Sequence, residues 1–156
     1  MAFALKGLPP AAFQRWFQAS GPELAAAGGR LITVDEDFGY PCRVSLTDAA
    51  VGEQVLLIPY QHVAGPSPYQ AIGPVFVRRD AAAAAEVVDA IPPYLSRRLL
   101  SVRAYDDNED IVDAEVAPGD RVDGLIRKLL AAPAVEHLHI HFARRGCFAC
   151  NVVRSA

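Results

Sequence analysis

The fold is decided near the C-terminal end of the chain, where residues 135–154 read VEHLHIHFARRGCFACNVVR. Two strand-forming runs, 135–142 and 147–154, flank a short polar segment, and this arrangement predicts an antiparallel hairpin. Successive side chains of a strand point to opposite faces, so three histidines share one face and three apolar residues share the other. The histidines are His137, His139 and His141, and the apolar residues are Leu138, Ile140 and Phe142. We expect the apolar face to pack in the core and the histidine face to be polar or partly wet.

Outward from this hairpin, the chain alternates short apolar runs with turn residues. Further strands are predicted at residues 30–34, 44–46, 54–60, 75–78, 99–105 and 111–116. Helices are predicted at residues 9–17, 22–27, 80–90 and 121–132. Strand pairs with short loops and few intervening helices favour an α+β fold, a mainly antiparallel or mixed sheet with a few helices packed on one side. No linker or repeat interrupts residues 1–156, which we expect to form a single globular domain.

Length and charge exclude several classes of protein. A chain of 156 residues that is 52% hydrophobic can bury a full core without metal or disulfide staples. Its 15 basic residues against 18 acidic ones give a net charge of −3, which argues against nucleic-acid binding. No apolar run is long enough for a membrane helix, and the start of the chain lacks the pattern of a secretion signal. With an odd number of cysteines, three, the sequence favours a cytoplasmic protein with no membrane partner.

The histidine face raises the question of a metal site. Neighbours two apart on a strand lie about 6.6 Å apart, so one ion can bind two of these imidazoles but not three. A symmetrical hairpin would place Cys150 opposite His139, which gives an alternative zinc site of His139, His141 and Cys150, whereas a bulge would turn Cys150 to the other face. Histidines that hydrogen-bond across a sheet, or that act as acids and bases, are the other interpretations. We favour no metal and predict no cofactor, with zinc as the alternative.

Two cysteines are candidate nucleophiles. Cys42 precedes Arg43 in a Pro-Cys-Arg turn, and Cys147 follows Arg145 and Gly146. A neighbouring cation favours the thiolate form of a cysteine. Either thiol could act with His141 as its base, so the candidate catalytic residues are Cys42, Cys147 and His141. A buried, inert cysteine is the competing interpretation of each.

Three arginines lie in or beside predicted strands with apolar neighbours, where a charge is costly unless it meets a carboxylate or an anionic ligand. They are Arg43, Arg78 and Arg103. Tyr69 and Tyr105 could line the same pocket, and we take these five residues as candidate ligand-binding residues. Ion pairs with Asp48, Asp113 or Glu115 are the structural alternative.

Several blocks together resemble a known family. They are GYPCRVSL at 39–46, SPY at 67–69, GPVFVR at 73–78, LSVRAY at 100–105 and ARRGC at 143–147. These blocks resemble an uncharacterised bacterial family, domain of unknown function 1203, over nearly the whole chain. The resemblance carries no activity. It implies that Cys42, Arg43, Arg78, Arg103, His141 and Cys147 belong to the family's pattern, that Cys150 does not, and that Phe142 stands where the family usually has asparagine.

The function that these residues favour is binding, with turnover left open, of a small anionic molecule in a pocket lined by arginine, histidine and cysteine. A thiol-dependent enzyme with a cysteine–histidine pair is the first alternative. A zinc-binding protein or a plain interaction module, acting as a homo-oligomer, is the second. The sequence does not decide whether the protein is an enzyme.

Overall fold

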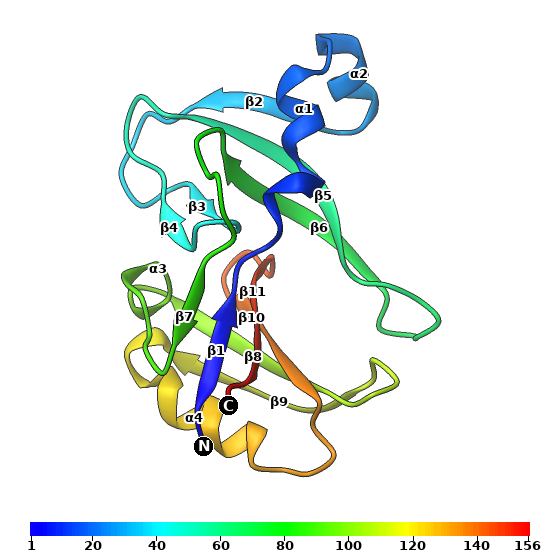
Figure 1. Cartoon of the computed structure of the whole chain (residues 1–156), viewed down its shortest axis with the longest axis vertical. Coiled ribbons are helices and arrows are strands. Elements are labelled where there is room, and N and C mark those ends of the chain that lie inside the picture. Colours follow the sequence, from blue (N-terminus) through cyan, green and yellow to red (C-terminus); the bar gives the residue numbers. More distant parts are fainter.

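The computed structural model describes all 156 residues and builds them into two β-sheets that lie one above the other along the long axis (Figure 1). From edge to edge, the six-stranded sheet contains β7 (Glu86–Val88), β1 (Phe3–Lys6), β11 (Phe148–Arg154), β10 (His137–Phe142), β8 (Leu99–Tyr105) and β9 (Ile111–Pro118). The five-stranded sheet contains β2 (Arg30–Thr33), β5 (Gln54–Val63), β6 (Ala71–Arg78), β3 (Pro41–Cys42) and β4 (Thr47–Asp48). Only β3 and β6 run parallel. The expected α+β fold with antiparallel and mixed sheets is confirmed, and the division into two sheets is new.

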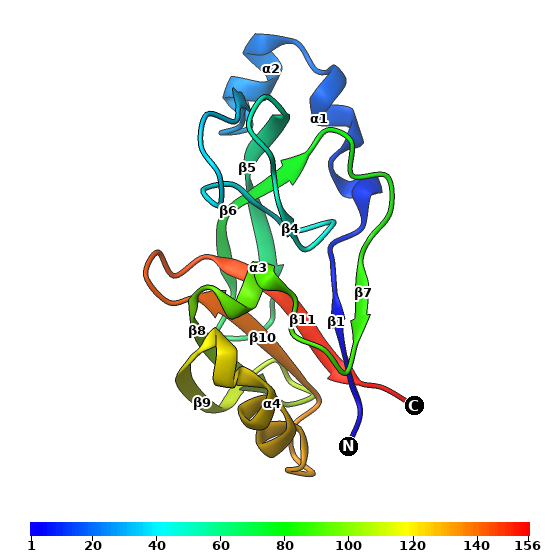
Figure 2. The ribbon, with the colours of Figure 1, turned by 90° about the vertical axis from the view of Figure 1, so that its left-hand side faces the viewer.

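The helices are short and are divided between the two sheets. They are η1 (Pro10–Ala12), α1 (Gln14–Gln18), α2 (Gly21–Ala26), α3 (Pro93–Ser96), η2 (Gly119–Arg121) and α4 (Val122–Leu130). α4 buries Val122, Ile126, Leu129 and Leu130, because these residues recur at helical spacing. α4 lies at the end of the molecule that holds the six-stranded sheet, and α1 and α2 lie at the opposite end (Figure 2). None of the helices has the length and apolar character needed to cross a membrane.

Both faces of β10 are buried. Leu138, Ile140 and Phe142 belong to a core cluster of 19 residues, which confirms the predicted apolar face. The histidine face lies against the five-stranded sheet, so His139 is only 5% exposed and His141 is not exposed at all. The expectation of a partly wet face is therefore wrong for these two histidines, because the sequence does not reveal that a second sheet covers them.

The register of the β10–β11 hairpin decides where Cys150 lies. His141 pairs with Phe148, as a symmetrical hairpin requires, but one extra residue in β11, Ala149, then shifts the pairing. Ile140 consequently pairs with Cys150, and His139 pairs with Asn151. Cys150 is fully buried in the same core cluster as Ile140. The alternative zinc site of His139, His141 and Cys150 is therefore wrong, since the bulge turns this thiol to the opposite face.

Two predicted elements also differ from the structure. Residues 80–90 are not helical: they contain β7, which pairs with β1, because the alanine run offers too little apolar surface for a helix to dock while the edge of β1 offers backbone partners. Residues 44–46 are not a strand but part of the turn between β3 and β4, in which Leu46 has a φ of +52°. That turn places Arg43 in the lining of a cavity and Asp48 beside two of the cavity's arginines.

Candidate functional site: an arginine-lined cavity

A cavity of about 370 Å³ opens where three loops meet. Its walls come from the loop before β3, from the junction of α3 and β8, and from the turn between β10 and β11. Five arginines line it: Arg43, Arg97, Arg98, Arg144 and Arg145. Three phenylalanines, Leu99 and Cys147 supply most of the remaining side chains; the phenylalanines are Phe38, Phe76 and Phe142. The cavity therefore combines apolar walls with an unusual number of guanidinium groups.

Arg43 is the most deeply buried of these arginines, at 1% exposure. Its Nε donates to the carbonyl of Phe148 and its Nη1 to the carbonyl of Pro41, each at 2.7 Å. Its Nη2 has no hydrogen-bond partner in the protein, and no carboxylate pairs with the guanidinium. A buried charge is costly without a counter-charge, so Arg43 is set up to meet an anion that enters the cavity.

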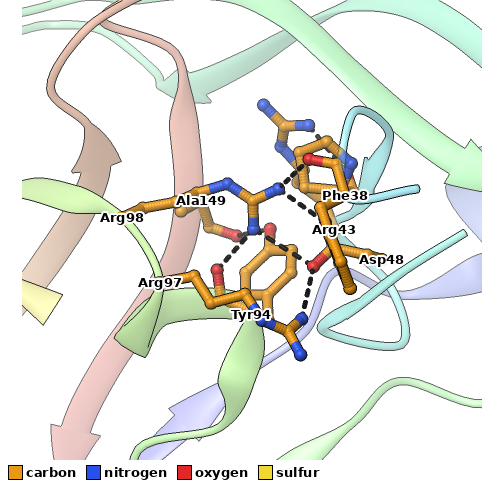
Figure 3. A network of polar contacts seen from close by, with 8 residues as sticks. Phe38, Arg43, Asp48, Tyr94, Arg97, Arg98 and Ala149 are labelled. Atoms are coloured by element: carbon orange, nitrogen blue, oxygen red, sulfur yellow. Dashed lines mark hydrogen bonds and ion pairs between the residues drawn. The ribbon is translucent and has the colours of Figure 1, made fainter. Parts of the chain in front are cut away.

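Arg97 and Arg98 are held together by one carboxylate. Arg98 binds Asp48 through both terminal nitrogens, at 2.6 and 3.3 Å, and Arg97 approaches the same carboxylate at 3.6 Å (Figure 3). Arg98 also donates to the carbonyls of Tyr94 and Phe38. The second of these bonds holds Phe38 in the left-handed region, with a φ of +60°, where it is 56% exposed and stacks on Arg97. The pair of arginines is thus preorganised, but Asp48 neutralises only one of them.

Arg144 and Arg145 extend from the turn between β10 and β11, are exposed and make no ion pair. Two backbone bonds close the turn: Gly146 donates its N–H to the carbonyl of Phe142 at 2.7 Å, and Phe142 donates its N–H to the carbonyl of Cys147 at 2.9 Å. A side-chain bond supports them, in which the Gly146 carbonyl accepts from Nδ1 of His141 at 3.0 Å. The bond from Nδ1 leaves the lone pair of His141 on Nε2, which has no partner. His141 therefore anchors the arginine turn from behind.

The charges around the cavity do not balance. Glu36 is the only acidic residue that lines it, and Asp48 is the only acid that pairs with its arginines. Five guanidiniums against these two carboxylates leave an excess of three positive charges. The whole chain has a net charge of −3, so this positive region is a local feature.

Of the three cysteines, only Cys147 lines the cavity, where it is half-buried. Cys42 is fully buried in the core of the five-stranded sheet, and its sulfur accepts from the N–H groups of Ser45 and Arg78. Burial raises the pKa of the Cys150 thiol to about 12. Neither ring nitrogen of His141 bonds a cysteine sulfur, since Nδ1 binds Gly146 and Nε2 is unpartnered. The structure therefore brings Cys147, but neither Cys42 nor His141, to the cavity wall.

We expect iodoacetamide to label Cys147 first in the native protein, at least about ten times faster than the other two thiols, because only Cys147 is accessible. Peptide mapping by mass spectrometry after a time course would measure the three rates. Labelling after denaturation, which should make the rates similar, is the control. Faster labelling of Cys42 than of Cys147 would contradict the placement described above.

The other predicted ligand residues lie outside the cavity. Arg78 pairs with Glu53 at 2.6 Å, and this hydrogen bond lowers the pKa of the Glu53 carboxyl. Arg103 lies on β8 opposite His139, Tyr69 is exposed, and Tyr105 stacks on His137. Sequence reasoning missed four cavity arginines. The sequence feature that could have identified them is that they form two adjacent Arg-Arg pairs, 97–98 and 144–145, each next to the end of a strand.

A fourth histidine, from the five-stranded sheet, joins the histidine face of β10. His62 of β5, which was not predicted to take part, lies with its ring 5.0 Å from that of His141 and 6.0 Å from that of His139. Burial lowers the pKa of His139 to about 2 and that of His141 to about 3, and it lowers the pKa of His62 as well; the charge of Arg103 acts in the same direction on all three. No group of three or more His, Cys, Asp or Glu side chains is arranged to hold a metal ion.

Comparison with known proteins identifies the family to which the chain belongs. Residues 39–154 match a family described as "Protein of unknown function (DUF1203)". The chain belongs to this family. The comparisons find no match among curated proteins and none among solved structures. The part of the chain that matches DUF1203 includes all five cavity arginines and Cys147, whereas Glu36 and Phe38 precede it. Phe142, which the sequence resemblance marks as unusual, packs against the guanidiniums of Arg43 and Arg98, 5.1 and 5.0 Å from its ring centre.

Proposed function

We propose that this protein binds a small organic polyanion in the arginine-lined cavity. The observation that carries the proposal is Arg43, a fully buried guanidinium that has no carboxylate partner and whose Nη2 is free beside the cavity. An arginine retained for stability alone would be expected to pair with an acid, as Arg78 does with Glu53. An arginine retained for a ligand keeps donors unused until the ligand arrives.

The electrostatics favour a ligand with more than one negative group. The excess of three positive charges comes from guanidiniums at two depths, with Arg43 at the base and Arg144 and Arg145 on the exposed turn. Guanidinium groups bind carboxylates and phosphates through paired hydrogen bonds, which are stronger than bonds between neutral groups. A molecule that carries two such groups would contact both depths at once.

The size and walls of the cavity indicate a small organic molecule rather than a macromolecule. A volume of about 370 Å³ lies at the lower end of the range of small-molecule pockets. Phe38, Phe76 and Leu99 give apolar surface between the charged groups, which a carbon skeleton could cover. We therefore place the ligand among small di- and tricarboxylates and phosphorylated metabolites.

A thermal-shift titration tests the proposal. Citrate, pyrophosphate and inorganic phosphate are added to the native protein at low ionic strength, with spermidine and glycerol as cationic and neutral controls. A bound anion at about 100 times its Kd adds about 2.7 kcal/mol of stability. In a protein of this size that raises Tm by about 5–10 °C. We expect at least one polyanion to reach this range and neither control to do so.

Matched variants locate the binding. Arg145→Ala removes a cavity arginine from an exposed turn, and Arg30→Ala removes an exposed arginine of β2 outside the cavity. We expect the first to reduce the thermal shift and the second to leave it unchanged. If no polyanion stabilises the protein at millimolar concentration, or if both variants respond alike, the proposed function is wrong.

A further inference from the structure

Cys147 is the only thiol that a small molecule in the cavity can reach. It lines the cavity beside the Arg144–Arg145 turn, whereas Cys42 and Cys150 have no exposed surface. The guanidinium of Arg43, which has no carboxylate partner and whose Nη2 makes no hydrogen bond, lines the same cavity. The Cys147 thiol and the buried Arg43 guanidinium can therefore contact the same bound molecule.

Cys147 forms no disulfide within the chain, and all three cysteines are free thiols. Residues 147–150 have the spacing Cys-x-x-Cys, which permits a disulfide when the segment is helical. Here Cys147 precedes β11 and Cys150 lies within that strand, so the segment is not helical. Cys150 also packs in the core among Ile140 and Val152. A disulfide reagent that enters the cavity therefore meets the thiol of Cys147 and not that of Cys150, which has no exposed surface.

We propose that Cys147 exchanges with small anionic disulfides and holds one half of the disulfide in the cavity as a mixed disulfide. The thiolate of Cys147 attacks one sulfur of the disulfide, the sulfur–sulfur bond of the reagent breaks, and a new bond forms between Cys147 and that sulfur. The other half leaves as a thiolate and takes a proton from water. The disulfide is the only oxidant required, and an external thiol reverses the reaction.

This inference rests on the proposed function, because the cavity arginines provide the selectivity. Positive charge lining a cleft raises the local concentration of anions and the rate at which they react. Carboxylates on the bound half would meet Arg43 and the exposed arginines, which also stabilises the product. A cationic disulfide would meet like charge at the same positions, so its reaction should be slow.

Three disulfides of matched chain length test this selectivity. Dithiodipropionate, hydroxyethyl disulfide and cystamine share an ethylene spacer and end in carboxylate, hydroxyl and ammonium groups. Each is incubated with the native protein, and modification of Cys147 is followed by intact mass and peptide mapping. Each rate is divided by the rate of the same reagent with free N-acetylcysteine, which corrects for intrinsic reactivity. We expect the corrected rate for dithiodipropionate to exceed that for hydroxyethyl disulfide at least about tenfold, with cystamine slowest.

The variants and the salt dependence separate a cavity effect from a general one. Arg145→Ala and a high salt concentration should both reduce the preference for the anionic disulfide, whereas Arg30→Ala should keep it. Cys147→Ser should abolish the modification. Corrected rates that are independent of charge, or fastest for cystamine, would overturn the exchange proposal. If polyanions raise Tm in that case, the proposed binding function stands without the exchange; if they do not, both fail.

Discussion

Acidification from pH 7 to pH 5 is expected to lower the free energy of unfolding by about 4 kcal/mol, because His139 and His141 are buried in the neutral form. Their pKa values, about 2 and about 3 in the folded protein, lie far below the ordinary value of 6.5 that applies to the unfolded chain. Above pH 6.5 both states are neutral and the histidines have no effect. Below it the unfolded chain takes up protons that the folded protein cannot, so stability falls with pH by about 1.4 kcal/mol per unit for each histidine.

Urea denaturation at pH 7, 6 and 5 would measure this loss. The carboxylates are largely ionised in both states over this range, so the histidines dominate the slope. The pKa of His62 is lowered as well, so replacing one titrating group, in His139→Gln, should reduce the slope by about a third to a half whatever its effect on stability at pH 7. A free energy of unfolding that stays constant between pH 7 and pH 5 would show that the histidines are not buried in the neutral form.

The histidine cluster also shows what the sequence could and could not predict. Alternation along 137–142 was enough to place three histidines on one face and Leu138 and Ile140 on the other, because a strand leaves no other arrangement. The position of His62 could not be predicted, since it depends on how the second sheet packs on the first. The burial of His139 follows from the same packing, and no local pattern reports it.

The sequence predicted an anion-binding pocket lined by arginine, but it identified only one of the five arginines that line the cavity. Arg43 was a candidate because a charge beside a strand and apolar neighbours needs a counter-charge, and the structure confirms its burial. Arg78 satisfied the same rule and proved to be paired with Glu53, because the rule cannot distinguish a ligand from a distant carboxylate. Arg97, Arg98 and the 144–145 pair lie in turns, where arginine is ordinarily solvated. Only the convergence of three loops gives them a common role.

The register of the β10–β11 hairpin depends on Ala149, and the sequence does not reveal it. One extra residue in β11 moves Cys150 from the histidine face to the core, and with it removes a complete candidate metal site. A bulge at an alanine has no sequence signature comparable to a glycine with positive φ, such as Gly146 in the adjacent turn. The sequence therefore left open both the symmetrical pairing and a bulged one, and the pairing decides which groups meet.

Arg43→Met is expected to weaken the binding of polyanions strongly while leaving the protein about as stable as before. Methionine keeps much of the length and apolar volume that packs against Phe142 and Phe76, but it carries no charge and no donor. The substitution loses two charge-assisted bonds to backbone carbonyls, each worth about 1.5–3 kcal/mol. It also removes the cost of burying an unpaired cation, several kcal/mol, so the two effects nearly cancel. For a bound anion there is no such compensation, and losing the deepest donor should weaken affinity by about 2–5 kcal/mol, at least about thirtyfold.

Arg78→Met provides the matched comparison, because Arg78 is also a strand-associated arginine but is bonded to Glu53 and lies outside the cavity. Its removal leaves a half-buried carboxylate unpaired, so we expect this variant to lose stability and to retain the anion-induced thermal shift. Urea denaturation and titration with the polyanion that stabilises the parent protein would measure both properties for both variants. The opposite pattern, in which Arg43→Met unfolds the protein and Arg78→Met eliminates binding, would mean that Arg43 is structural. The two variants are expected to lose different properties, Arg43→Met its anion binding and Arg78→Met its stability. A variant that simply fails to fold would lose both properties together, so this pattern would show that Arg43 serves a ligand.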